Sequence, residues 1–326
     1  MTSRAIVRLR ESMGLSQADL ADRLGMKRAQ LCRIERGGVA PTPPTIARIA
    51  KALGVNPEDL AEGDCRLEGA LMPTRRAVAR LKAARVDVAA READLDAQED
   101  RRGIVSKTTL PLIHAYLLQP HAGEILAASL RDSLRVGMAA FADLVWTLEF
   151  ANVRVWGVDL PDGADSAGWW NPERETLTLA IDSAATPERQ LYRLAYELGA
   201  ACLFRSFGGH PIAETKKQHR FLAEFAADFL MPAATIADMV SKTGVTPKTW
   251  TFAQLLSFKA HFGVSAEAFA LRLEELGLID PELRAAFRDR LRARYKTHRK
   301  AMEPAPCLNV LKCGYKLDIL SDEGEK

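Results

Sequence analysis

The sequence predicts a mainly α-helical protein with one small β-sheet, an α+β chain built from more than one domain. Its 326 residues are 48% hydrophobic, which is enough apolar material for separate buried cores. Apolar residues recur at helical spacing in most segments, whereas Asn152–Leu160 and Glu175–Ile181 have the alternating, β-branched or apolar character of strands. Turn-forming residues lie between these two segments. We therefore expect a small antiparallel sheet with Trp169 and Trp170 near its middle.

The composition indicates a cytoplasmic protein without a membrane span. No stretch of about 18 consecutive apolar residues occurs. The start, MTSRAIVRLR, lacks the apolar core of a signal peptide. The five cysteines are too scattered for a disulfide framework, so we expect free thiols, although Cys307 and Cys313 are close enough in sequence to form a redox pair.

The stretch Leu15–Gly37 is typical of two short helices joined by a tight turn. Ser16 is placed to cap the first helix, with Asp19 returning the hydrogen bond, and Gly25 supplies the turn. The second helix, expected to start near Met26, buries its apolar side chains against the first. Its outward residues are polar and mostly cationic: Lys27, Arg28, Gln30, Arg33 and Arg36.

Positive charge is concentrated in this part of the chain. Residues 1–55 contain ten Lys or Arg and four Asp or Glu, a net charge of +6, whereas the whole chain carries only +3. Such a concentration is typical of a domain with a polyanionic partner. A basic helix held rigidly by a second helix fits the DNA major groove. The alternative is an ordinary helical hairpin with a solvated basic face.

Residues 1–62 are expected to form one five-helix domain, because two more helices follow a turn-rich loop at 37–44. The runs at 14–37 and 41–60 resemble the Cro/C1-type (XRE family) helix-turn-helix repressors. This resemblance implies a lambda-repressor-like fold that binds double-stranded operator DNA as a homodimer, without a cofactor. By position it implies that Arg28, Ala29 and Arg33 face bases, that Gln17, Lys27 and Arg36 hold phosphates, and that Gln30 lies on the same surface. Arginine can bind guanine O6 and N7 bidentately, which makes Arg28 and Arg33 the best candidates for specificity.

Residues 63–135 are expected to be a helical linker and a candidate dimerisation region. The segment Thr74–Arg102 is Ala-rich and densely charged, which predicts a helix, and Leu110–Leu118 and Ile125–Val136 predict further ones. Four apolar residues fit coiled-coil spacing, but two charged residues interrupt it, so both a dimerising coiled coil and a plain helix remain open. The apolar positions are Val78, Leu81, Val88 and Leu95, and the interruptions are Arg85 and Glu92.

Residues 136–280 carry a second set of motifs. Pro187 opens a helix with one buried stripe, and His219–Pro232 forms another with phenylalanines on one face. The order of strand, hairpin, helix and Phe/Ala-rich helix ending in Leu-Met-Pro resembles the ImmA/IrrE metallopeptidase-like family. This resemblance implies a zincin-like fold. Downstream, Leu255–Leu276 has the pattern of two helices around a Gly-Val-Ser turn, which we interpret as packing structure and not as a second DNA reader.

The zinc chemistry of that family requires His-Glu-x-x-His, in which two histidines bind Zn²⁺ and the glutamate activates water. A carboxylate from the next helix completes the ligands. Here Tyr196 and Ala200 stand at the histidine positions, His219 is nearest the third ligand position, and only Glu197 is retained. We expect no metal and no catalytic residue, and instead a ligand pocket formed by these four residues. A displaced metal site of Glu197, His210 and His219 is the less favoured alternative.

Residues 281–326 are predicted to be a basic helix and a flexible tail. Arg284–Lys300 holds eight Lys or Arg and one Asp, which favours a solvated or partner-docking face over a phosphate-binding one.

The whole chain is predicted to be a sequence-specific transcriptional regulator that acts as a repressor. Its degenerate domain would dimerise, sense a small molecule or single-stranded DNA, or bind a partner protein. Two other functions remain open: an active metallopeptidase with non-standard ligands, and an antitoxin that regulates its own operon.

Overall fold

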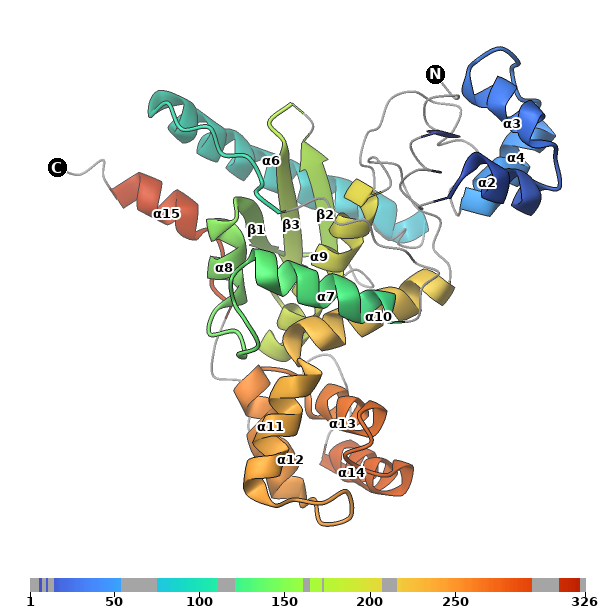
Figure 1. Ribbon diagram of the computed structural model, residues 1–326. Helices are drawn as coiled ribbons and strands as arrows, with labels where there is room; N and C mark the ends of the chain where they lie inside the picture. The colour runs from blue at the N-terminus through green and yellow to red at the C-terminus, as the bar shows by residue number, and fades with distance from the viewer. Residues whose placement is uncertain are drawn as a thin grey trace.

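The structure is a computed structural model that describes residues 6–7, 10, 15–53, 75–110, 121–160, 165–171, 173–206, 216–294 and 311–322. It confirms a mainly helical chain with one small sheet (Figure 1). The elements are α2 (Gln17–Leu24), α3 (Arg28–Glu35), α4 (Pro43–Leu53), α6 (Arg75–Arg101), α7 (Ala122–Ser133), α8 (Leu144–Phe150), β1 (Val153–Val158), β2 (Ser166–Asn171), β3 (Thr176–Asp182), α9 (Pro187–Ser206), α10 (Lys216–Leu230), α11 (Ala233–Thr243), α12 (Phe252–Phe262), α13 (Ala266–Glu275), α14 (Pro281–Arg294) and α15 (Tyr315–Asp322).

The three described strands are ordered β1-β3-β2. Strand β1 pairs with β3 in parallel, with Val155 opposite Leu179, whereas β2 pairs with β3 antiparallel. The antiparallel pairing expected for the two recognised strands was therefore wrong. The reason is the unrecognised strand β2, which forms a hairpin with β3 and returns the chain to the direction of β1. Its sequence, with Gly168 between small residues and tryptophans, has little of the β-branched character that marks a strand.

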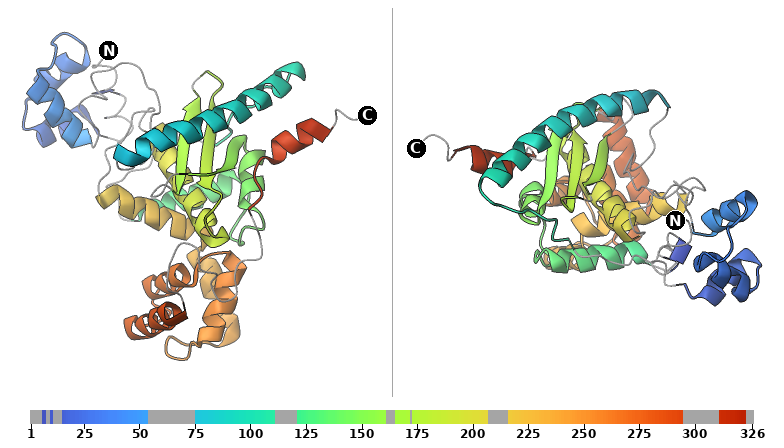
Figure 2. Two further views of the ribbon diagram at one scale, coloured as in Figure 1. Left: turned by 180° about the vertical axis from the view of Figure 1, so that it is seen from behind. Right: turned by 90° about the horizontal axis from the view of Figure 1, so that it is seen from above.

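Both faces of this sheet are covered by helices (Figure 2). Successive residues of a strand point to opposite faces, and nearly every residue of β1 and β3 is buried. Val155 and Leu179 belong to the large core that also contains residues of α9 and α10. Trp156 and Ala180 belong to a smaller cluster under α6. This two-sided burial explains why the strands are rich in apolar residues at consecutive positions.

Helix α6 confirms the helix predicted over Thr74–Arg102, and it packs across β1. Val88 and Leu95 are buried against Trp156, so two of the four coiled-coil positions contact the sheet of the same chain. The side chains of Val78 and Leu81 lie outside the described residues.

A buried ion network joins α6 to the sheet. The Arg154 guanidinium, on β1, is 4% exposed, and its Nη2 lies 2.6 Å from Asp96 Oδ1 and 3.2 Å from Glu99 Oε2. Glu92 accepts a hydrogen bond from the Thr178 hydroxyl on the central strand. These acidic residues follow each other at helical spacing, so one face of α6 is held to the sheet by charge as well as by apolar contact.

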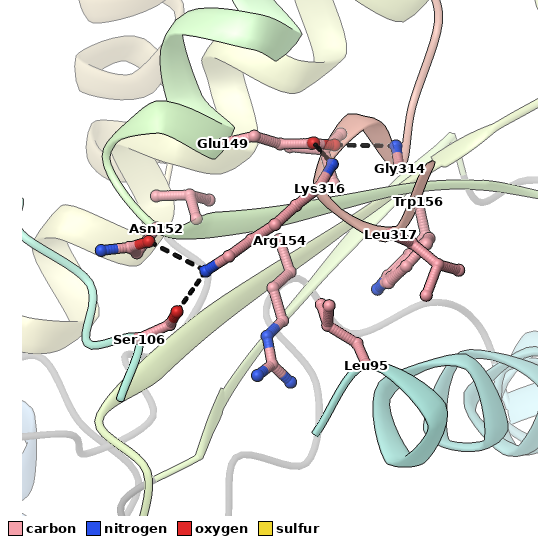
Figure 3. Close-up of a pocket in the computed structure, with 11 residues that line it drawn as sticks. Leu95, Ser106, Glu149, Asn152, Arg154, Trp156, Gly314, Lys316 and Leu317 are labelled. Atoms are coloured by element: carbon pink, nitrogen blue, oxygen red, sulfur yellow. Dashed lines mark hydrogen bonds between the residues drawn. The ribbon is translucent and has the colours of Figure 1, made fainter. Parts of the chain in front are cut away.

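The C-terminal residues 311–322 form an ordered segment, although we expected a flexible tail. Buried Glu149 on α8 accepts hydrogen bonds from the backbone N–H groups of Gly314 at 2.7 Å and Lys316 at 3.0 Å (Figure 3). The Lys316 ammonium reaches Glu99 Oε1 at 2.8 Å and Asn152 Oδ1 at 3.1 Å. Desolvation raises the pKa of Glu149, so the two backbone donors offset part of the cost of burying its carboxylate. The cavity beside them has a volume of about 10 Å³, room for about one water.

Helices α11–α14 form a second helical layer below the sheet and its covering helices (Figure 1). The two helices predicted within Leu255–Leu276 are confirmed as α12 and α13, which meet at Gly263. Buried Lys259 on α12 lies 3.1 Å from Glu188 at the start of α9. Charged pairs therefore link this layer to the helices above it.

Three cysteines among the described residues, Cys32, Cys202 and Cys313, are not in disulfide bonds. Cys65 and Cys307 lie outside the described part of the chain, so the redox pair stays a prediction. Within the described ranges, no helix has both the length and the apolar character needed to cross a membrane.

We predict that Arg154→Ala lowers the free energy of unfolding by about 3 kcal/mol, because it leaves buried carboxylates without their cation. Arg174→Ala is the matched control, since Arg174 contacts the same Asp96 but its side chain is 31% exposed. Its effect should be less than about 1 kcal/mol. Urea unfolding of both variants measures this, and equal losses would contradict the assigned network.

Candidate functional site

Helix α2 starts and ends as the sequence predicts. The Ser16 hydroxyl accepts a hydrogen bond from the Asp19 N–H at 3.2 Å, and the Asp19 carboxylate accepts one from the Ser16 N–H at 2.8 Å. These bonds lower the pKa of Asp19. Gly25 ends the helix with a φ of 59°, the left-handed conformation that glycine adopts without strain.

Helix α3 begins at Arg28, two residues after the expected start, and Lys27 occupies the N-cap position without a side-chain capping hydrogen bond. Leu31 and Ile34 are buried against α2, as predicted. All six residues predicted on the outward surface of this helix are exposed: Lys27, Arg28, Ala29, Gln30, Arg33 and Arg36. The structure thus brings them together on one solvent-facing side.

A buried ion pair that sequence reasoning missed holds α3 in place. Arg10 Nε donates to Glu35 Oε1 at 2.7 Å, and both side chains are nearly inaccessible. Gln17 Nε2 donates to the other oxygen of Glu35 at 2.7 Å, so this half-buried amide braces α3 from the start of α2. No periodic pattern in the sequence connects a cation and an acid 25 residues apart. The contact of Gln17 with phosphate stays a prediction.

Cationic side chains on a braced helix have defined chemistry. Guanidinium groups can grip base edges or phosphates bidentately, and the N-terminus of α3 adds the partial positive charge of its free N–H groups. The side chains of the first turn include no acid that would oppose an anion. This face is therefore suited to a polyanion.

The second site lies on α9, where Tyr196, Glu197 and Ala200 follow the predicted spacing. The Tyr196 hydroxyl is hydrogen-bonded to His219 Nδ1 on α10, with 2.8 Å between the two atoms. Ala200 is half-buried and His219 is exposed. The structure therefore joins Tyr196 and His219, while Glu197 points elsewhere.

Glu197 is fully buried beneath the edge strand β2. The Ser166 hydroxyl donates to its Oε2 at 3.0 Å, and its Oε1 has no hydrogen-bond partner. Gly168 lies so close that a Cβ there would be 3.2 Å from Oε1. Both partners belong to β2, the strand that the sequence pattern did not reveal, so neither could be found beforehand.

Burial raises the pKa of Glu197 to about 7, and the Ser166 hydrogen bond and the charge of Arg193 offset only part of this effect. Near neutral pH the carboxyl is therefore divided between its acid and its carboxylate form. In an apolar interior the neutral acid is the more stable form.

The zinc site implied by the family resemblance does not fit the residues present. Ala200 has no donor atom, and the side chains of Tyr196 and His219 bond to each other. Among the residues that the structure describes, no three His, Cys, Asp or Glu side chains gather in a way that could hold a metal ion. His210, part of the alternative displaced site, lies outside those residues.

Comparison with protein families matches residues 6–60 to a helix-turn-helix family and residues 151–274 to the IrrE N-terminal-like domain. The chain is a fusion of a helix-turn-helix domain and an IrrE-like domain. The first match supports a DNA-binding transcription regulator. A comparison with curated proteins finds no match.

The IrrE-like domain is supplemented by residues that precede its matched range. Helix α6 covers one face of its sheet, and α7 packs against α10. At this second contact, a Cβ on Gly123 would lie 2.7 Å from the backbone N of Phe225, so only glycine allows the observed approach. The helices between the two matched domains therefore complete the core of the second one.

We predict that Glu197→Gln removes a pH-dependent loss of stability from the IrrE-like domain. A carboxyl whose pKa rises from 4.5 to about 7 on folding destabilises the fold progressively as pH increases through that window. The difference in unfolding free energy between variant and wild type should therefore grow by about 3 kcal/mol between about pH 5 and about pH 8.

Urea unfolding of both proteins at these pH values measures the difference in unfolding free energy. The contributions of ionisable groups that both proteins share cancel in this difference. The exposed α14 variant Glu282→Gln is the control and should show no pH-dependent difference from wild type. A constant difference between Glu197→Gln and wild type would mean that Glu197 ionises normally in the folded protein.

Proposed function

We propose that the protein is a cytoplasmic, sequence-specific transcriptional repressor that binds operator DNA as a homodimer. In this proposal, the IrrE-like domain is a catalytically inactive relative of metallopeptidases that senses a ligand or binds a partner. The observation that carries the proposal is the exposed cationic face of α3, braced by the buried Arg10–Glu35 pair. A rigid helix with outward guanidinium groups can enter the major groove without first becoming ordered.

The residues on this face divide into two roles. Arg28 and Arg33 read bases, with Ala29 close enough to contact a thymine methyl group. Lys27 and Arg36 hold phosphates and set the position of the helix without reading sequence. In this proposal Gln17 makes a further phosphate contact, and in the structure its amide donates to Glu35.

Dimerisation follows from the size of the DNA contact. One helix-turn-helix domain reads only a half-site, and two copies related by symmetry read a pseudo-palindrome about one helical turn apart. Binding over a promoter would then block transcription.

The loss of peptidase activity is supported by the chemistry of the α9 site. A zinc peptidase needs three protein ligands and a metal-bound water. In this chain the corresponding positions hold Ala200 and Tyr196, and the Tyr196 hydroxyl is hydrogen-bonded to His219. Glu197 is buried and accepts a hydrogen bond from Ser166.

We predict that Arg33→Ala weakens operator binding by about 1–3 kcal/mol and relaxes its specificity. Lys27→Ala should weaken operator and random DNA alike, and it should lower the slope of log affinity against log salt by about one unit. Lys242→Ala on α11 removes an exposed lysine far along the chain and serves as the control. Footprinting upstream of the protein's own gene and salt-dependent binding assays measure these effects. An unchanged footprint after loss of both Arg28 and Arg33 would show that α3 is not the reading helix.

We predict that the purified full-length protein, incubated with zinc and dialysed, retains less than one zinc per chain and does not hydrolyse casein. Tyr196→His combined with Ala200→His restores two donors at helical spacing and should increase retained zinc. Atomic absorption measures the metal content. Stoichiometric zinc in the wild type that is lost in His219→Ala would instead support an active metallopeptidase.

A further inference from the structure

A second hollow lies between the helices that cover the sheet and the C-terminal helical layer. Its volume is about 640 Å³ and its walls come from α7, α9, α10, α11 and α13. Pockets for small molecules typically measure roughly 300–1,000 Å³. None of the four residues of the α9 site lines it, so this pocket is a separate feature of the domain.

Small side chains keep the hollow open. Where α10 faces α11 and α13, the lining residues include four alanines: Ala223, Ala227, Ala233 and Ala268. Larger apolar side chains, Leu271 and Leu276, form part of the wall. Leu271 is 42% exposed, so its side chain presents apolar surface at the pocket. The pocket thus offers apolar surface to a ligand.

The polar residues of the pocket carry an excess of negative charge. Its lining includes four carboxylates and three basic side chains. The carboxylates are those of Glu124, Glu224, Asp228 and Glu275, and the basic side chains are those of Arg220, Arg272 and His121. Arg272 already donates to Asp228 and lies 3.5 Å from Glu275. His121 Nδ1 lies 3.4 Å from Glu124 and 4.0 Å from Glu224, and all three side chains are partly exposed to solvent.

The carboxylates of the pocket influence each other. Burial raises the pKa of Asp228 to about 6 despite the contact with Arg272, and the charges of Glu124 and Glu224 add to this rise. A cation bound among them would relieve this repulsion, whereas an anion would increase it.

We propose that this pocket binds an organic cation with an apolar body, such as an alkyl or arylalkyl amine. The ammonium group lies between Glu124 and Glu224, where it displaces the exposed His121 imidazole. The apolar part contacts Leu271 and Leu276. Because the walls belong to two helical layers, the ligand joins α10 to α13. This inference gives a chemical class to the ligand-sensing role and, in that respect, rests on the proposed function.

The test uses phenylbutylamine as the probe and phenylbutanol as its neutral analogue, with isothermal titration calorimetry on the full-length protein. The amine should bind at least about tenfold more tightly than the alcohol. Leu271→Arg, at an exposed position, places a cation on the wall and should weaken amine binding at least about tenfold. Glu224→Gln should weaken it about fivefold. The exposed α14 variant Glu282→Gln, outside the pocket, should bind as the wild type does.

Equal affinities for amine and alcohol, no binding of either, or undiminished amine binding by Leu271→Arg would each overturn the proposal. Circular dichroism of each variant confirms that it is folded. Since the titration contains no DNA, its failure is distinct from a failure of operator binding, which footprinting without the amine measures separately.

Discussion

The structure depends on covering both faces of a three-stranded sheet, because the strands β1 and β3 carry apolar residues on each face and a sheet of this size is stabilised by packing against helices. The large apolar core under α9 and α10 covers one face, and α6 covers the other. On the α6 face, the buried cation of Arg154 fixes the position of the helix, because its charge is compensated only when acidic residues of α6 surround it. The same network extends through Glu99 to Lys316, so the C-terminal segment is docked as a consequence.

The two functional regions use charge in opposite ways. In the helix-turn-helix domain one ion pair is buried to brace α3, and the remaining cations of that helix face solvent. In the IrrE-like domain Glu197 is buried, and its Oε1 has no hydrogen-bond partner among the described residues. Solvated cations are available to a polyanion, whereas a carboxyl enclosed by β2 contributes to packing and to pH sensitivity. Because of this difference, we propose that the N-terminal domain carries the DNA-binding function of the protein.

The helical layer α11–α14 contributes walls of the pocket in which we propose that an amine binds. It meets the upper layer through buried pairs, Lys259 with Glu188 and Arg272 with Asp228, while alanines leave a hollow beside the second pair. These two ion pairs hold the helical layers together at fixed points. A ligand in the hollow would change the contact between the layers. A ligand shifts the equilibrium between two arrangements of such a contact only by as much as it binds one of them more tightly than the other, which is the physical requirement for sensing.

Local patterns by themselves determined the helix-turn-helix unit, because the Ser16–Asp19 cap, the Gly25 turn and the outward cations all act within a few residues. They also determined most helices. Only the tertiary structure decided that β1 and β3 are parallel, that Glu35 is paired with Arg10, and that Glu197 lies under Gly168 and Ser166. These features join residues that are distant in sequence. Their energies come from desolvation and close packing, which cannot be predicted from the spacing of apolar residues along the chain.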